Sequence, residues 1–264
     1  MKFRMWFESR VSLVSEMHTQ LLLEDEIELL HKYRVNLRKL YACSETYVKN
    51  INKHSSKKLS KLIKKLLKPT ALLRDVDLFL IEIQTLKCSN VSKVKLDAIM
   101  KKKRENAFKI LMQTLCSDEY KKSLKLLIMM TKETEFFVYE THKIDVHKII
   151  SEVEKSRYEE LSCINMQTSF DSLHNLRKEF KKFRYALDIY EQCFSHNKDM
   201  NFDFVKLKRL QGFFGEIQDN FVRLELVKSV KEELDEAEYL EFHNNYELKL
   251  FTSKKALFKN FDIL

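Results

Sequence analysis

The near absence of glycine and proline restricts the folds open to this chain. Only two Gly and one Pro occur in 264 residues, far below average usage. Tight β-turns and glycine-rich phosphate loops depend on these residues, so the sequence offers little material for either. Apolar residues, 44% of the chain, recur instead at helical spacing and suffice for a sizeable core. The predicted fold class is all-α.

Two stretches share one helical pattern. Residues 173–190 read LHNLRKEFKKFRYALDIY, and residues 30–47 read LHKYRVNLRKLYACSETY. At about 100° per residue, the basic groups of each stretch fall on one face of the helix, directly beside its apolar stripe. This basic face consists of His174, Arg177, Lys181, Arg184 and Tyr185 in the downstream stretch, and of His31, Arg34 and Arg38 in the upstream stretch.

The position of these cations favours an anionic ligand. An ordinary amphipathic helix places its charges opposite the apolar stripe, where water solvates them. Like charges gathered where water is scarce are costly unless an anion or an acidic partner neutralises them. An extended anion is the predicted partner. The alternative is a buried ion network with acidic neighbours such as Asp75 or Asp219.

In these residues the chain resembles the CHAD family, all-helical histidine-containing domains that bind inorganic polyphosphate. Each half of the family pattern opens with a helix that carries His, then Arg three residues later, then more Arg or Lys, and the next helix ends near an Asp. The matching residues are His31, Arg34, Arg38, Lys39, Arg74, Asp75 and Asp77 in the first half, and His174, Arg177, Lys181, Arg184, Tyr185, Leu210, Gln211, Gly215 and Asp219 in the second. Tyr41 stands where the family often has another Arg, and Ala71 replaces the usual Gly. Weaker anion binding is therefore expected in the first half.

An internal duplication sets the expected domain organisation. Leu66 and Leu210 are 144 positions apart, whereas His31 and His174 are 143 apart, and so constant an offset indicates a repeat. We expect one domain over residues 1–264, with halves 1–131 and 132–264. The expected architecture is two four-helix bundles related by a pseudo-twofold axis, and the resemblance implies a central basic channel.

Further cations extend the predicted site. A lysine stripe lies within roughly 60° on one helix face, where a solvated surface is an equally good interpretation. The polyphosphate-binding set therefore also includes Lys57, Lys61, Lys64 and Lys68 of this stripe, together with Arg74, Lys208 and Arg209. The run from Lys101 to Arg104 covers all sides of a helical turn and is expected to be mainly exposed charge.

Local signals locate some helix boundaries. The single proline, Pro69, is predicted to kink or restart a helix because it lacks a backbone N–H. Ser117 or Asp118 is expected to cap one helix, and Asp171 or Ser172 to cap the downstream basic helix. Another helix is expected over residues 135–163.

Catalysis, metals and cofactors are not expected. The sequence has no P-loop, G-x-S-x-G or H-E-x-x-H motif. Glu26 and Glu28 resemble the start of the E-x-E-x-K signature of tunnel triphosphatases, but Leu30 occupies the Lys position. Arg and Lys fill the positions beside His31 and His174 that a helical zinc site would need for its ligands. The predicted function is non-catalytic binding.

The expected partner is inorganic polyphosphate, and a net charge of +9 is consistent with any polyanion. Nucleic acid is one alternative, although the aromatic residues lie mostly on apolar stripes; a helical scaffold for acidic proteins is another. The sequence has no run of eighteen consecutive apolar residues, so membrane insertion is not expected. Five scattered cysteines are expected to be small buried residues in a reducing cytosol. The predicted location is the cytoplasm, with association with polyphosphate or storage granules.

Overall fold

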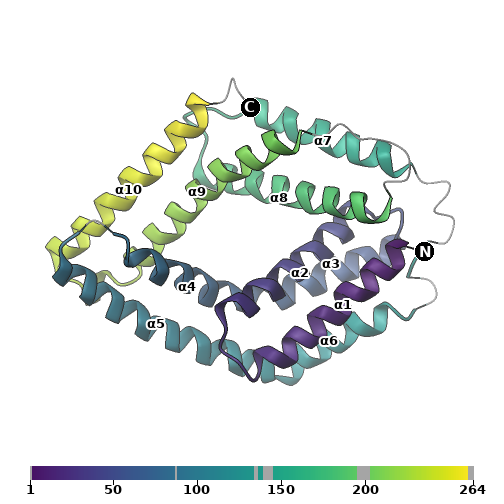
Figure 1. The fold of residues 1–264 in the computed structure, drawn as a ribbon, viewed down its shortest axis with the longest axis horizontal. Coiled ribbons are helices and arrows are strands. Elements are labelled where there is room, and N and C mark those ends of the chain that lie inside the picture. Colours follow the sequence, from purple (N-terminus) through teal and green to yellow (C-terminus); the bar gives the residue numbers. More distant parts are fainter. Residues whose placement is uncertain (1, 87, 134–135, 139–144, 195–202, 261–264) are drawn as a thin grey trace. The chain divides into compact units, whose positions relative to one another are not determined.

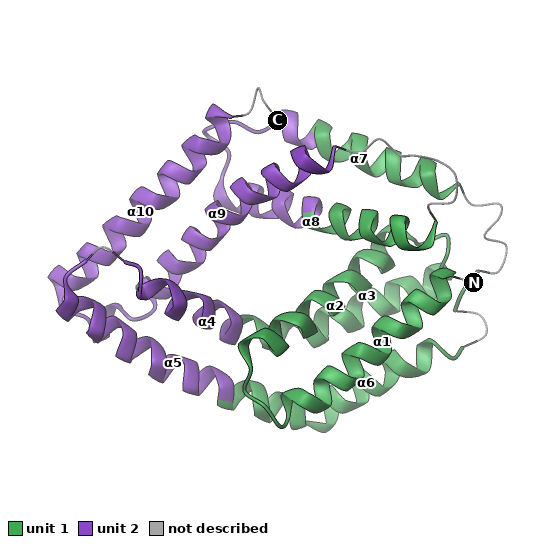
Figure 2. Ribbon diagram, in the orientation of Figure 1, with its two compact units in different colours: residues 1–71, 109–159, 181–201 green, residues 72–108, 160–180, 202–264 purple. Residues whose placement is uncertain are grey.

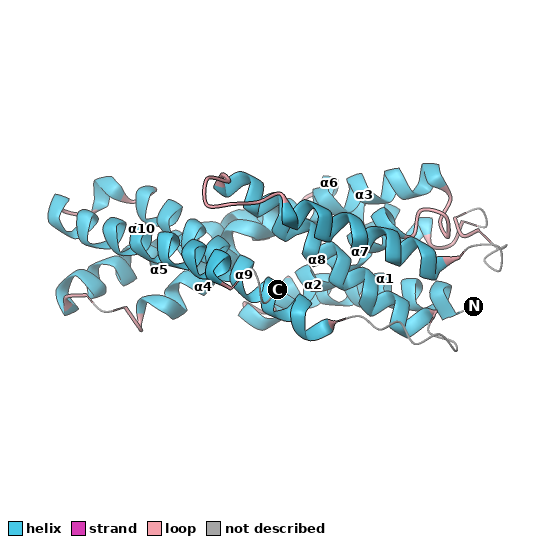
Figure 3. Cartoon of the chain, turned by 90° about the horizontal axis from the view of Figure 1, so that it is seen from above, coloured by secondary structure: helices cyan, strands magenta, loops and turns pink. Residues whose placement is uncertain are grey.

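The computed structural model describes residues 2–86, 88–133, 136–138, 145–194 and 203–260, and its secondary-structure elements are helices (Figures 1 and 3). In chain order these are α1 (Lys2–Leu21), α2 (Ile27–Thr46), α3 (Lys53–Leu67), the 3-10 helix η1 (Lys68–Thr70), α4 (Ala71–Ile83), α5 (Asn90–Cys116), α6 (Asp118–Met130), α7 (Val146–Ser162), α8 (Phe170–Cys193), α9 (Phe204–Lys228), the 3-10 helix η3 (Lys231–Glu233) and α10 (Glu236–Lys259). Strand-like pairing within the described residues amounts to an isolated bridge between Ile51 and Phe137. The all-α prediction is confirmed.

The chain forms two compact units from interleaved segments (Figure 2). Unit 1 comprises residues 1–71, 109–159 and 181–201, and unit 2 comprises residues 72–108, 160–180 and 202–264. Helices α5, α7 and α8 therefore each contribute residues to both units. The pseudo-twofold relation between halves 1–131 and 132–264 stays a prediction.

Unit 1 contains a ring of four helices. Helix α2 packs against α1 and α3, and α6 packs against the same two helices (Figure 1). The apolar stripe of α1, including Phe7 and Val14, is buried, and so are Tyr33 and Leu37 of α2. These residues recur at helical spacing, and burial of such a stripe against neighbouring helices provides most of the stability of a helix in a protein. A second bundle of this kind stays a prediction.

In unit 2, Glu82 of α4 links three helices. Its carboxylate pairs with the Arg223 guanidinium of α9 and with Nζ of Lys249 of α10 at 3.1 Å. The Tyr246 hydroxyl donates to the same carboxylate at 3.3 Å, and the Tyr246 ring packs edge-on against Phe79. A partly buried carboxylate with several donors keeps its charge compensated. The contact fixes α4 against the packed pair α9 and α10.

The basic run on α5 divides into two kinds of side chain. Lys101 and Lys102 are exposed, as expected, whereas Lys103 is half-buried. Arg104 is instead half-buried, and its Nε donates to the Asp77 carboxylate of α4 at 2.7 Å. Asp77 is 1% exposed, so this bond supplies the positive partner that a buried carboxylate requires. The expectation of exposure is wrong for Arg104 because helical periodicity does not reveal a partner on another helix.

The helix boundaries confirm two predictions, those for Pro69 and Ser117. Pro69 lies in η1, which separates α3 from α4, and the Ser117 side chain caps α6 by accepting from the Tyr120 backbone N–H at 3.2 Å. The predicted cap of α8 is wrong. This helix begins at Phe170, and the Ser169 hydroxyl accepts from the Ser172 backbone N–H at 3.2 Å.

The helix expected over residues 135–163 corresponds to α7, which begins only at Val146. Residues 135 and 139–144 lie outside the described part of the chain. Among the described helices, none has the length and apolarity needed to cross a lipid bilayer.

The cysteines differ in burial. Cys43 and Cys193 are buried, as expected, and Cys88 is half-buried. Cys116 and Cys163 are exposed, which corrects the expectation that all five are core residues. Both exposed cysteines lie at or just beyond the end of a helix, at the last position of α5 and just after α7, where the helical apolar pattern no longer determines which side faces the core.

Candidate functional site

In unit 1, Tyr41 of α2 brings two cations from other helices together. Its ring centroid is 5.1 Å from Nζ of Lys64 on α3 and 5.9 Å from Nζ of Lys182 on α8. Ammonium groups at these distances are attracted by the electron-rich face of an aromatic ring. Contact with Tyr41, helped by Glu45, raises the pKa of Lys64. Lys64 is therefore fully charged near neutral pH, where it can contact an anion.

A second group of cations surrounds Lys39 of α2. Its Nζ lies 3.8 Å from the Asp188 carboxylate of α8, and the Lys39 side chain is 19% exposed. Burial lowers the pKa of Lys39; Asp188 opposes this shift, and the charges of Arg10 and Arg184 reinforce it. Arg10 and Arg184 therefore both disfavour the charge of Lys39, and Asp188 is the carboxylate that supports it. An anion bound beside Lys39 would support this charge further.

Arg10 of α1 is a member of this group that the sequence interpretation missed. Its Nη1 donates to the Asn36 side-chain oxygen at 3.2 Å, and its guanidinium carbon lies 5.8 Å from the centroid of the Trp6 ring. Its buried Nε has no hydrogen-bond partner among the described residues. The contacts hold a half-buried cation in place with one donor unused. The spacing of one helical turn between Trp6 and Arg10 is the sequence signal that could have indicated this contact.

Arg34 occupies a different environment from the other predicted cations of α2. It is 6% exposed and donates to the Thr70 hydroxyl, which in turn donates to the Leu67 carbonyl oxygen at 2.7 Å. This connection fixes η1 against α2. His31 and Arg38 are half-buried, and the four lysines of the α3 stripe are exposed; these are Lys57, Lys61, Lys64 and Lys68.

Helix α8 divides its predicted residues between the units. Lys181, Arg184 and Tyr185 belong to unit 1, whereas His174 and Arg177 belong to unit 2. Lys181 and Tyr185 are half-buried and Arg184 is exposed. The structure therefore brings Lys39 and Arg184, both predicted, close to Arg10, which was not.

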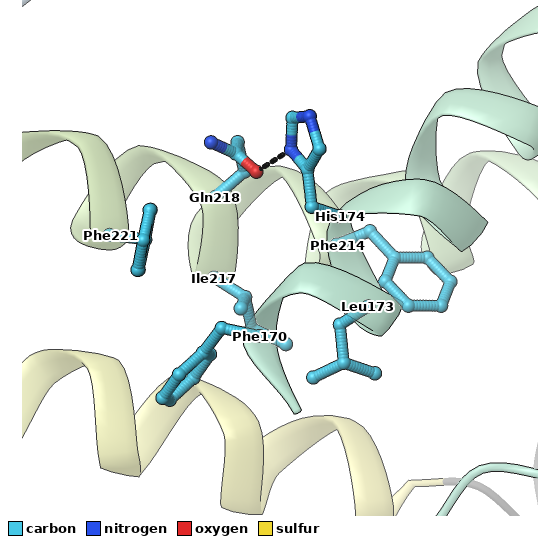
Figure 4. A pocket seen from close by; sticks show the side chains of 7 residues that line it. All are labelled: Phe170, Leu173, His174, Phe214, Ile217, Gln218 and Phe221. Atoms are coloured by element: carbon cyan, nitrogen blue, oxygen red, sulfur yellow. Dashed lines mark hydrogen bonds between the residues drawn. The ribbon is translucent and has the colours of Figure 1, made fainter. Parts of the chain in front are cut away.

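In unit 2, His174 bonds to α9 at the edge of a small apolar pocket (Figure 4). Its Nδ1 donates to the side-chain oxygen of Gln218, so neutral His174 keeps its lone pair on Nε2. Figure 4 shows the other ring nitrogen directed away from Gln218. The remaining pocket residues are Phe170, Leu173, Phe214, Ile217 and Phe221. The bond fixes the ring orientation of His174.

Arg177 lies near an acidic neighbour, as the ion-network alternative expects. Its Nη2 is 4.0 Å from the Asp219 carboxylate of α9, but Asp219 is 47% exposed and the pair is therefore not buried. Lys208 and Arg209 are exposed on α9, and Arg74 is half-buried on α4. In the described residues, no group of His, Cys, Asp and Glu provides the three ligands of a metal site.

The described part of the chain is all-helical, with predicted cations on both α2 and α8. The family model described as "CHAD domain" matches residues 14–228, and the chain belongs to this family. The structure of PptA from Streptomyces chartreusis has 10% sequence identity and a TM-score of 0.75, over 99% of this chain and 98% of that one. The CHAD domain from the plant Ricinus communis has 15% identity and a TM-score of 0.74, over 97% and 91%. Comparison with curated proteins gives no match.

Proposed function

We propose that this protein binds inorganic polyphosphate and catalyses no reaction on it. The observation that carries the proposal is the placement of Lys64 and Lys182, from two helices, around Tyr41 of α2. Phosphate oxygens accept strong charge-assisted hydrogen bonds from Lys and Arg. Polyphosphate is a chain of such groups without bases or sugars, so closely spaced cations select it by charge density. Membership of the CHAD family supports the proposal.

The proposed contacts comprise the predicted cations and two residues that the structure adds. In unit 1 they are His31, Arg34, Arg38, Lys39, Lys57, Lys61, Lys64, Lys68, Lys181, Arg184 and Tyr185, with Arg10 and Lys182 added. In unit 2 they are Arg74, His174, Arg177, Lys208 and Arg209. A central channel common to both repeated helices stays a prediction. Cytoplasmic binding is part of the proposal, supported by the exposed free thiols of Cys116 and Cys163.

The central test reverses two charges beside Tyr41. Lys64→Glu with Lys182→Glu should weaken binding of medium-length polyphosphate by about 1.5 to 3 kcal/mol for each charge-assisted hydrogen bond to phosphate that the substitutions remove. The slope of log affinity against log salt should shrink by roughly 0.7 for each cation that no longer pairs with a phosphate, on the analogy with single-stranded nucleic acid. Titration calorimetry at several salt concentrations measures both quantities.

The matched control is Lys121→Glu with Lys125→Glu on α6. Both lysines are exposed, belong to the same unit and give the same change of net charge, but α6 packs against α1 and α3 and lies across the ring from α2. A small decrease in affinity from the general reduction of charge is expected. Equal decreases in both folded variants, verified by circular dichroism, would contradict a site at Tyr41. Single-stranded DNA of matched charge should bind more weakly than polyphosphate; tighter binding would favour the nucleic-acid alternative.

A further inference from the structure

The solvent-facing side of α10 carries uncovered apolar side chains. Leu240, Leu248 and Phe251 are 46%, 66% and 56% exposed, whereas Phe242 and Tyr246 of the same helix are buried. At about 100° per residue, the three exposed residues fall within an arc of roughly 80°. Apolar side chains aligned on one face form a contact surface, in contrast to single scattered exposures.

Opposite charges flank this face. Glu236 lies four residues before Leu240, and Lys255 lies four residues after Phe251. Both charged residues are exposed and lie within about 60° of Leu240 on the helical wheel. Neither participates in the ion pairs found among the described residues. The face therefore has an acidic end, a middle in which exposed Asn244 and Glu247 accompany the three apolar side chains, and a basic end. In the antiparallel arrangement described next, Glu247 faces Asn244 and meets no like charge.

This face of α10 is complementary to the same face of a second α10 that runs in the opposite direction. If a second α10 lies antiparallel about a twofold axis between residues 245 and 246, each Glu236 faces a Lys255 and each Leu240 faces a Phe251. Leu248 then lies within one turn of the axis. A parallel pair would instead place Glu236 against Glu236 and Lys255 against Lys255, and like charges in an interface oppose association.

We infer that α10 is a self-association surface that pairs antiparallel with α10 of a second copy of this chain. A wholly basic partner helix would fit the Glu236 end but would meet a like charge at Lys255, so the charge pattern favours a second copy. Helix α10 lies beyond residues 14–228, the part matched by the family, and the inference is independent of the proposed ligand. A single pair of helices is small for an interface, so we expect a weak dimer.

Charge reversal tests both the surface and its orientation. Sedimentation velocity without polyanion, over about 1 to 200 µM, should show a reversible dimer. Glu236→Lys and Lys255→Glu should each weaken dimerisation at least roughly tenfold, because each creates two like-charge pairs in the dimer. An equal mixture of these two variants should associate more strongly than either alone, since every end then pairs opposite charges. The double variant, which carries Glu236→Lys and Lys255→Glu in one chain, should associate like the unchanged chain.

The controls are Glu105→Lys and Lys102→Glu, which make the same charge changes at exposed positions of α5 and should leave dimerisation unchanged. Leu248→Asp should abolish it by replacing an apolar contact near the twofold axis with a charge. A chain that stays monomeric throughout, or a mixture no stronger than its two components, would overturn the inference. The double variant retains the net charge and so separates pairing from general electrostatics.

Discussion

Asp188 is the carboxylate that pairs with Lys39. It supports the Lys39 charge against burial and against the charges of Arg10 and Arg184. A bound phosphate would compete with this carboxylate for the same ammonium group. We therefore expect Asp188 to lower the affinity of Lys39 for an anion and to stabilise the Lys39 charge when no anion is bound.

Replacing Asp188 by Asn should tighten polyphosphate binding several-fold near neutral pH, because the anion no longer competes with a fixed carboxylate for Lys39. The free energy of unfolding should fall slightly in the absence of ligand, since half-buried Lys39 then loses its carboxylate partner. Calorimetry and urea denaturation of the variant measure the two effects. Weaker binding in a folded variant would mean that the pair positions Lys39 for the ligand.

Buried His18 makes the stability of the protein depend on pH. Burial lowers the pKa of His18 and the charge of Lys121 adds to this, while the bond to the Leu115 carbonyl oxygen opposes it. The folded state thus favours neutral His18. Its contribution is complete above the unfolded pKa near 6.5 and is lost as pH falls from there through the lowered folded pKa. Urea denaturation between about pH 7.5 and 5.5 should show a smaller loss of stability for His18→Gln than for the unchanged chain; an unchanged dependence would contradict this.

At the scale of elements, the glycines of α9 have no steric reason to be glycine. A Cβ added to Gly212 or Gly215 meets no atom within 4 Å, and both residues lie inside the helix. Gly212→Ala and Gly215→Ala should therefore each raise the free energy of unfolding by about 0.5 to 1 kcal/mol. Chemical denaturation checks this, with Ala98→Gly at an exposed position of α5 as the opposite change. Destabilisation by either alanine would indicate that a ligand or partner approaches the α9 backbone.

The existence of the helices could be predicted from the sequence, because apolar spacing reports the buried side of each one. The start of α8 could not. Ser169, Asp171 and Ser172 are all good caps, and Phe170 contributes packing against Phe221 of α9, 6.0 Å between ring centroids. Helix α8 starts directly after Ser169, the first of these three candidate caps, and Phe170 is its first residue. The pattern within one helix does not reveal the contact of Phe170 with another helix.

The candidate site could be predicted only in part, for a similar reason. The helical wheel places Arg184 beside the apolar stripe and the family resemblance adds Lys39, but neither identifies Lys182, whose long side chain reaches Tyr41. The wheel also does not reveal that Arg34 is buried and donates to Thr70. Partners on other helices decide these orientations, and their distances are not encoded in local spacing.

At the scale of the whole molecule, the predicted cations divide into one set in each unit, and the proposed shared channel requires one ligand to bind both sets. Affinity should rise with polyphosphate length until one chain reaches both sets and then level off, because the second contact becomes intramolecular. Triphosphate should bind weakly. Calorimetry with size-fractionated polyphosphate measures this; equal affinities for triphosphate and long chains would indicate small separate anion sites and contradict a shared channel.

The uneven burial of the cysteines makes the unchanged chain suitable for fluorescence measurements. Cys116 in unit 1 and Cys163 in unit 2 are exposed, whereas burial raises the pKa of Cys43 and also that of Cys193, the latter to about 12. Maleimide dyes react with thiolates and should label Cys116 and Cys163 first, as peptide mass spectrometry can verify. A donor and an acceptor then mark one position in each unit. Energy transfer between them would report directly whether polyphosphate changes the separation of the two units.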